Sequence, residues 1–208
     1  QNLTAEKLAR IYAGRRTLKQ NPVLKHLDLD RLAADNVGVH RFVLEAEGAA
    51  VLSAGYQFDR SRKPGSVAIA LDPATNEMKV MDVDGNWTGK YHYEGRQITH
   101  QELTDIFAEW AKDFPILSVE DGQWEDGWDA WLDQIERFKG TGITMIGDDL
   151  LVTQAGRIVM LLEKMKQRGM LDADGRIKPE YNVGILIKVN QNGFVTTGIN
   201  DPSDGYMG

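Results

Sequence analysis

The sequence predicts an α/β protein in which parallel strands alternate with helices. Short apolar runs that suit buried strands recur along the chain, and segments with apolar residues at helical spacing follow them. Each of these apolar runs also ends at an ionisable residue. This repeated order is typical of a parallel sheet, and it is compatible both with an open doubly wound sheet and with a barrel.

The first part of the chain is expected to be helical. Apolar residues recur at roughly helical spacing over residues 3–20, and basic residues lie between them. A charged helix face exposed to solvent explains this pattern better than an arm that binds phosphate or an acidic partner. We therefore predict an N-terminal helical segment at residues 1–34 and a second domain at residues 35–208. Within that domain, residues 37–44 alternate partly as a strand does.

Four uncharged apolar runs predict the strands of the sheet, at residues 66–71, 116–119, 143–147 and 183–187. A helix is expected between each strand and the next. The first begins at a capping box, Thr99 to Glu102, and ends before Pro115. The second carries Trp128 and Trp131, whose helical spacing favours packing in the core over a binding surface. The third covers residues 158–162, and a surface hairpin around residues 84–86 precedes the first helix.

Composition excludes several classes of protein. The 208 residues contain 24 Lys and Arg against 31 Asp and Glu, so the net charge of −7 argues against a nucleic-acid partner. The absence of cysteine excludes disulfides and thiolate metal ligands, and it fits a cytoplasmic location. No apolar run reaches the length of about 20 residues that spans a bilayer, so no membrane span is expected.

Charged residues end all four predicted strands: Asp72, Glu120, Asp148 and Lys188. Because the carboxyl ends of parallel strands meet at one edge of a sheet, these side chains are expected to lie together. Crowded carboxylates repel one another unless a hard cation neutralises them, and carboxylate oxygens suit Mg²⁺. The pattern therefore predicts a divalent-metal site.

Lys188 has the chemistry of a general base in such a site. Burial and the field of the metal would both lower its pKa, so that it can remove an unreactive proton next to a carboxylate. Each acid taken alone is as readily explained as the N-cap of the following helix. Asp121 and Asp149 are the better candidates for capping, because each follows a predicted ligand and adjoins a loop or helix start.

Four segments resemble the enolase family in sequence and in order. Residues 118–122, Ser-Val-Glu-Asp-Gly, and residues 146–153, Ile-Gly-Asp-Asp-Leu-Leu-Val-Thr, are similar to two of its metal-ligand segments. Residues 185–191, Ile-Leu-Ile-Lys-Val-Asn-Gln, are similar to the strand with its catalytic lysine. Residues 68–72, Ala-Ile-Ala-Leu-Asp, are similar to its first ligand strand, and residues 35–42 resemble an earlier barrel strand more faintly.

The resemblance implies an α/β barrel and a Mg²⁺-dependent lyase, phosphopyruvate hydratase. Asp72, Glu120 and Asp148 would hold Mg²⁺, and Lys188 would act as base on 2-phosphoglycerate, which is dehydrated to phosphoenolpyruvate in glycolysis. The resemblance also implies a cytoplasmic homodimer. A lyase acting on another acid is a weaker match to these segments.

The chain also departs from the family. It has no Gly-Asp-Glu-Gly-Gly segment, which supplies the family's general acid, and no Ser-His-Arg-Ser-Gly-Glu segment near the substrate phosphate. The second active-site lysine is absent, and Arg41 falls where the family has a glutamate. The expectation is therefore an incomplete barrel from a truncated or shortened relative. The alternative function is a catalytically inactive enolase-like scaffold or binding protein.

Overall fold

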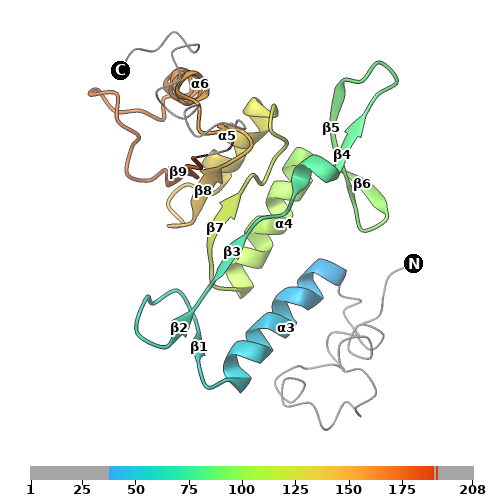
Figure 1. The fold of residues 1–208 in the computed structure, drawn as a ribbon, viewed down its shortest axis with the longest axis vertical. Helices are drawn as coiled ribbons and strands as arrows, with labels where there is room; N and C mark the ends of the chain where they lie inside the picture. Colours follow the sequence, from blue (N-terminus) through green and yellow to red (C-terminus); the bar gives the residue numbers. More distant parts are fainter. Residues whose placement is uncertain (1–37, 190, 192–208) are drawn as a thin grey trace. The chain divides into compact units, whose positions relative to one another are not determined.

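The computed structural model describes residues 38–189 and 191, which fall into two compact units (Figure 1). Unit 1 contains residues 38–69, 93–96 and 110–115. Unit 2 contains the other described residues, and it holds every site residue that the sequence predicts. The helix predicted at residues 3–20 lies outside the described residues, so the predicted domain boundary at residue 34 stays a prediction.

Unit 1 begins with helix α3 (Val39–Ser53), followed by the short parallel strands β1 (Gln57–Phe58) and β2 (Ser66–Val67). The strand predicted at residues 37–44 is therefore wrong. The short run alternates, but it belongs to the 15-residue helix α3. The buried residues of α3 are Phe42 and Ala49, two turns apart on one side, and Leu44 and Gly48, one turn apart on another. Gly48 allows the Phe58 ring to pack against the helix, because a Cβ atom there would lie 2.6 Å from the ring.

Arg41 lies on α3 rather than on a barrel strand, which corrects the faint match of residues 35–42 to an early strand of the enolase barrel. Its guanidinium donates a hydrogen bond of 2.6 Å to Asp113 and lies 3.7 Å from Glu45. It also lies 5.3 Å from the centre of the Phe114 ring. Arg41 therefore serves packing and charge pairing within unit 1.

The main sheet has the strand order β3-β7-β8-β9, with β7, β8 and β9 parallel (Figure 1). Its strands are β3 (Ile69–Leu71), β7 (Ile116–Glu120), β8 (Thr144–Gly147) and β9 (Val183–Ile185). Each of the four strands falls at a predicted apolar run, so their positions are confirmed. The run at residues 66–71 is divided, because its first two residues form β2 in a separate sheet. The sheet does not close, and the described residues therefore form an incomplete barrel.

The register of the sheet aligns the ends of its strands. Glu120 pairs with Ile146, and Gly147 pairs with Ile185. The residue that ends β7 and the residues that follow β8 and β9 therefore lie at the same edge. This alignment brings the predicted site residues of separate strands together.

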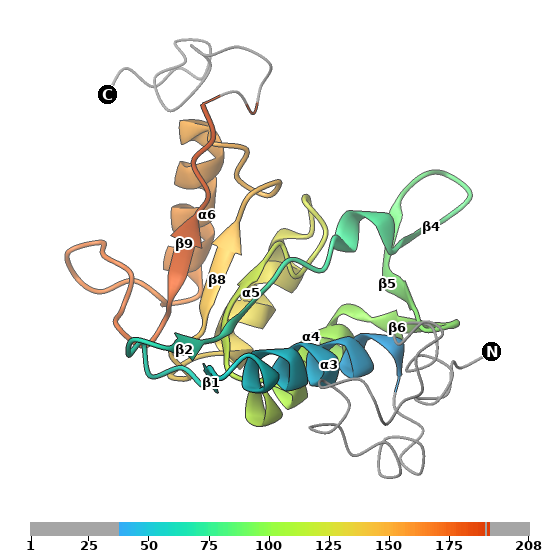
Figure 2. The same ribbon diagram turned by 60° about the horizontal axis from the view of Figure 1, so that its bottom comes forward.

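The helices after α3 follow the predicted order, with α4 (His100–Asp113), α5 (Trp128–Arg137) and α6 (Ala155–Gln167). The capping box of α4 is confirmed, because Thr99 N donates to Glu102 Oε2 over 2.7 Å and Glu102 N donates to Thr99 Oγ1 over 3.2 Å. In both views α6 runs beside β8 and β9 (Figure 2). Trp131 is only 1% exposed, so its predicted place in the core is confirmed.

The predicted hairpin belongs to a three-stranded sheet of β4 (Lys79–Met81), β5 (Trp87–Tyr93) and β6 (Arg96–Thr99), in which β4 and β5 are antiparallel. The Asp82 side chain closes the turn by accepting hydrogen bonds from Asp84 N and Asn86 N over 2.9 and 2.8 Å. None of the described helices has the length and apolar character needed to cross a membrane.

Gln134 is a buried polar side chain in the core of unit 2. It lies on α5 and is 1% exposed, and neither of its side-chain polar atoms has a hydrogen-bond partner among the described residues. Because a buried polar group without a partner costs about 1–3 kcal/mol, Gln134→Met should stabilise the protein by about 1–2 kcal/mol. Urea unfolding measures the change, with Gln167→Met at the exposed end of α6 as the control. A loss of stability in Gln134→Met would contradict the prediction.

Candidate metal centre

Acidic side chains from three strand ends line one pocket of about 240 Å³ in unit 2. Its lining comprises Asp72, Ala74, Thr75, Asn76, Glu77, Glu120, Asp121, Asp148 and Asp149. The structure therefore brings together the three carboxylates that the sequence proposes as ligands, although they come from β3, β7 and β8. Lys188 follows β9 and reaches the same site through its ion pair with Asp148.

The carboxylates of this pocket lie close enough to affect one another's ionisation. The pKa of Glu120 is raised, first by burial and then by the negative charges of Asp72 and Asp148. Because neighbouring carboxylates repel one another when they are ionised, a nearby cation would stabilise their ionised forms. The donors are carboxylate oxygens, which hard divalent cations prefer, so the residues present fit a metal of this kind.

Lys188 pairs with the most enclosed of the predicted ligands. Its Nζ donates to Asp148 Oδ2, and the Lys188 side chain is 41% exposed whereas that of Asp148 is 9% exposed. The hydrogen bond to Asp148 raises the pKa of Lys188, with further help from the charges of Asp149 and Glu120. The lowered pKa expected from burial is therefore wrong for this arrangement, because the side chain is half-exposed and surrounded by negative charge.

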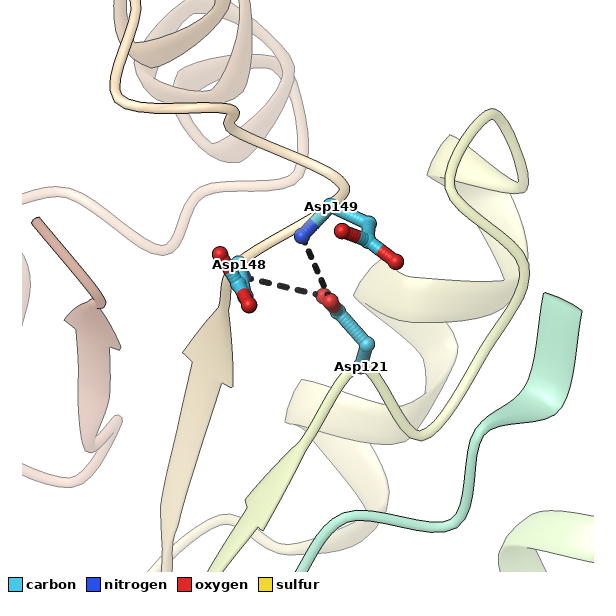
Figure 3. A group of neighbouring side chains, drawn as sticks. All are labelled: Asp121, Asp148 and Asp149. Carbon is cyan, nitrogen blue, oxygen red and sulfur yellow. Dashed lines mark hydrogen bonds between the residues drawn. The ribbon is translucent and has the colours of Figure 1, made fainter. Parts of the chain in front are cut away.

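Asp121 organises the loop that carries Asp148. Its carboxylate accepts hydrogen bonds from the backbone nitrogen atoms of Asp148 and Asp149, over 3.1 and 2.6 Å (Figure 3). It also accepts one from Leu150 N over 3.5 Å. These donors belong to a turn and not to a helix start. The N-caps of α5 and α6 are Gly127 and Gln154, and neither makes a side-chain capping hydrogen bond, so the capping roles predicted for Asp121 and Asp149 are wrong. Asp121 itself has a φ of +39°, in the left-handed region, which turns the chain sharply after β7.

Asp121, Asp148 and Asp149 also place one oxygen each within 4.8 Å of one another, so this triad could hold a metal ion. Figure 3 shows the Asp121 carboxylate directed at the backbone of the other two residues. Since its oxygens already accept backbone N–H groups, Asp121 is better suited to holding the loop than to binding an ion. Among the described residues, Asp72, Glu120 and Asp148 share the pocket but do not form a group whose oxygens all lie within 4.8 Å of one another. Asp148 belongs to both sets.

Two residues that sequence reasoning missed join the loops around the pocket. Asn76, in the short helix η3 (Thr75–Glu77), accepts a hydrogen bond of 3.0 Å from Glu125 N and donates one of 3.0 Å to Asp149 Oδ2. Arg157 of α6 donates to the carbonyl oxygens of Leu150 and Glu125, the latter over 2.7 Å. Neither residue ends a strand or belongs to a recognised motif, so the sequence offered no signal for them.

The ionisation of Asp121 should make stability depend on pH. Burial raises the pKa of Asp121 from 3.8 to about 6, so the folded protein keeps a proton that the unfolded chain loses between these values. The stability present below about pH 4 should therefore fall as pH rises to about 6, by at most about 3 kcal/mol. Urea unfolding in metal-free buffer should show that the free energy of unfolding of the parent chain falls over this pH range. The Asp121→Asn variant should not show this fall. A stability difference between the two chains that does not change with pH would contradict the assignment.

An open parallel α/β sheet with an acidic pocket at its carboxyl edge places the chain in the class of barrel-type domains that carry acidic sites at strand ends. Residues 32–206 match the family model described as the enolase C-terminal TIM barrel domain. The chain belongs to this family.

Curated relatives agree with this assignment. The chain is 34% identical to an enolase of Bdellovibrio bacteriovorus over 164 residues, which are 78% of this chain and 32% of the relative. It is 37% identical to an enolase of Natranaerobius thermophilus over 64% of this chain and 27% of the relative. It is 34% identical to an enolase of Elusimicrobium minutum over 66% of this chain and 28% of the relative. The matched region thus spans between 27% and 32% of the length of these relatives.

Proposed function

We propose that this chain carries the metal ligands and the base of a Mg²⁺-dependent lyase that converts 2-phosphoglycerate reversibly to phosphoenolpyruvate. The observation that supports it is the meeting of Asp72, Glu120 and Asp148 at one pocket, with Lys188 bound to Asp148. The relatives that the chain resembles are named enolase. A carboxylate cluster beside an amine suits the removal of a proton next to a substrate carboxylate.

In this proposal Asp72, Glu120 and Asp148 hold Mg²⁺. The bound ion would neutralise the substrate carboxylate as negative charge develops on the neighbouring carbon. Lys188 Nζ accepts the proton from the second carbon of the substrate, which requires that the lysine first leave Asp148 and lose its own proton. The group that protonates the departing hydroxide is not assigned, because the family's segment for it is absent from the sequence.

The family also supports three wider proposals. We propose a cytoplasmic location, which the absence of cysteine fits. We propose a homodimer, as the resemblance implies. We further propose that residues 35–208 form the enolase-like domain, and the family match to residues 32–206 supports a boundary near its start.

A second candidate is a catalytically inactive scaffold or binding protein of the same fold. It is favoured by the ion pair between Lys188 and Asp148, which raises the pKa of Lys188 and so opposes its use as a base. Such a protein would keep the acidic pocket and its affinity for cations. It would not turn over substrate.

One experiment separates the two candidates. The protein is mixed with Mg²⁺ and 2-phosphoglycerate in deuterated water, and both ultraviolet absorbance of phosphoenolpyruvate and deuterium exchange at the second carbon are followed. The proposed lyase predicts product formation with exchange. Exchange without product would show a working base without a general acid. Calorimetric binding of Mg²⁺ with neither product nor exchange would contradict the lyase and support the scaffold.

A further inference from the structure

Two polar residues without a role in the proposed function, Thr153 and Gln191, connect the Asp148 carboxylate to the Lys188 backbone. The Gln191 side-chain nitrogen donates to Asp148 Oδ1. Thr153 Oγ1 donates to Gln191 Oε1 over 2.7 Å, and Lys188 N donates to Thr153 Oγ1 over 3.0 Å. A continuous series of hydrogen bonds therefore runs from the segment that bears the proposed base to a proposed metal ligand.

The direction of each of these hydrogen bonds follows from the chemistry of the groups. An ionised carboxylate only accepts, so Gln191 must present its NH₂ group to Asp148. Its carbonyl oxygen then faces Thr153 and accepts the hydroxyl proton. The Thr153 oxygen is left free to accept the backbone N–H of Lys188. Every donor meets an acceptor, so the orientation of the Gln191 amide is determined.

An unusual turn places Thr153 in this position. Val152 and Thr153 have φ values of +42° and +55°, in the left-handed region that β-branched residues rarely adopt. The turn is held by Leu151 N and Val152 N, which both donate to the carbonyl oxygen of Asp148 over 3.1 and 2.7 Å. Thr153 is 2% exposed. Strain of this kind persists where surrounding contacts fix the backbone, and it is concentrated at functional sites.

The two oxygens of Asp148 have partners of different charge. Oδ1 accepts from the neutral amide of Gln191, and Oδ2 accepts from the Lys188 ammonium group. A divalent cation that approaches Asp148 repels the ammonium strongly but not the amide. The cation can therefore replace Lys188 at Oδ2 while Gln191 keeps its hydrogen bond to Oδ1.

We propose that Gln191 and Thr153 are positioning residues that fix the plane of the Asp148 carboxylate through Oδ1, so that Oδ2 is occupied in turn by Lys188 and by a divalent cation. The inference rests on the proposed function for the role of Asp148 as a metal ligand. It adds an explanation of why binding of a cation at Asp148 would release the Lys188 amine from that carboxylate. Lys188 then leaves its carboxylate partner at the time when the site is ready for substrate.

Mg²⁺ titration calorimetry tests the positioning role. Partners that orient a metal ligand typically contribute about 10–100-fold to metal affinity, so Gln191→Met and Thr153→Val should each weaken Mg²⁺ binding within this range. Thr153→Val keeps the β-branched shape and removes only the hydroxyl group. Thr153→Ser keeps the hydroxyl group and should restore affinity to within about threefold of the parent chain.

Two control variants remove an amide group and a hydroxyl group at positions outside the acidic pocket. Gln167→Met replaces an exposed glutamine at the end of α6, and Thr88→Val removes a hydroxyl group that donates to Val80 O over 2.8 Å. Both should bind Mg²⁺ as the parent chain does. Parent-like affinity in Gln191→Met and Thr153→Val, beside clear binding by the parent chain, would overturn the inference and leave the proposed function intact.

A measurement without metal examines the same hydrogen bonds. In the nuclear magnetic resonance spectrum of the metal-free protein, the Gln191 side-chain NH₂ should exchange slowly with water, and Thr153→Val should accelerate that exchange. In the parent chain the slow exchange should persist when Mg²⁺ is added. Exchange as fast as that of the exposed Gln167 amide would overturn the inference whether or not Mg²⁺ binds. Slow exchange in a parent chain that binds no Mg²⁺ would instead overturn the proposed function, and with it the shared use of Oδ2.

Discussion

Lys188→Ala should lose proton exchange at the second carbon of 2-phosphoglycerate by about 10²–10⁴-fold, the range that a positioned general base contributes. Alanine leaves no group at this position to accept the proton. Because the ammonium group of Lys188 competes with a cation for Asp148 Oδ2, Mg²⁺ affinity should be retained or increased. The measurement is deuterium exchange into substrate, followed together with Mg²⁺ titration.

The control for this experiment is Lys166→Ala, which removes an exposed lysine from the last turn of α6. It should exchange the substrate proton at the rate of the parent chain. If Lys188→Ala also exchanges at the parent rate while it binds Mg²⁺, another group removes the proton and Lys188 is not the base.

Asp148→Ala should weaken Mg²⁺ binding by about 100-fold or more, since loss of a direct ligand exceeds the effect of losing a partner that only orients one. The substitution removes a proposed ligand and also leaves Lys188 and Gln191 without their acceptor. Proton exchange should be lost together with Mg²⁺ binding, in contrast to Lys188→Ala. Calorimetry and the exchange assay distinguish these two patterns.

The control for Asp148→Ala is Asp84→Ala in the exposed turn between β4 and β5. It removes the same charge from a position outside the pocket and should leave Mg²⁺ affinity unchanged. Equal affinity in Asp148→Ala and the parent chain would show that Asp148 is not a ligand.

The strands of the main sheet could be predicted from the sequence because each buried parallel strand is an uncharged apolar run with an ionisable residue at its end. The capping box of α4 could be predicted because its donors and acceptors lie within four residues. The strand expected at residues 37–44 was wrong because a short apolar run fits both periods, and the run turned out to lie within the 15-residue helix α3.

The candidate site could be predicted in part. Asp72, Glu120 and Asp148 were found because they end strands, and parallel strands bring their ends to one edge. Asn76, Arg157 and Thr153 were not found, because their roles depend on loops distant in sequence that meet only in the folded chain. The burial expected for Lys188 was wrong, since its exposure and its pairing with Asp148 depend on the local structure after β9. The lowering of its pKa by a bound metal stays a prediction.

Affinity cleavage with iron(II) in place of Mg²⁺ tests most directly whether separate strand ends share one divalent ion. Radicals formed by bound iron with ascorbate and peroxide cut the backbone close to the ion, and mass spectrometry locates the cuts. The account predicts cuts beside Asp72, Glu120 and Asp148 in the same sample, all suppressed by excess Mg²⁺. Cuts that avoid these three segments, or that excess Mg²⁺ leaves unchanged, would contradict it.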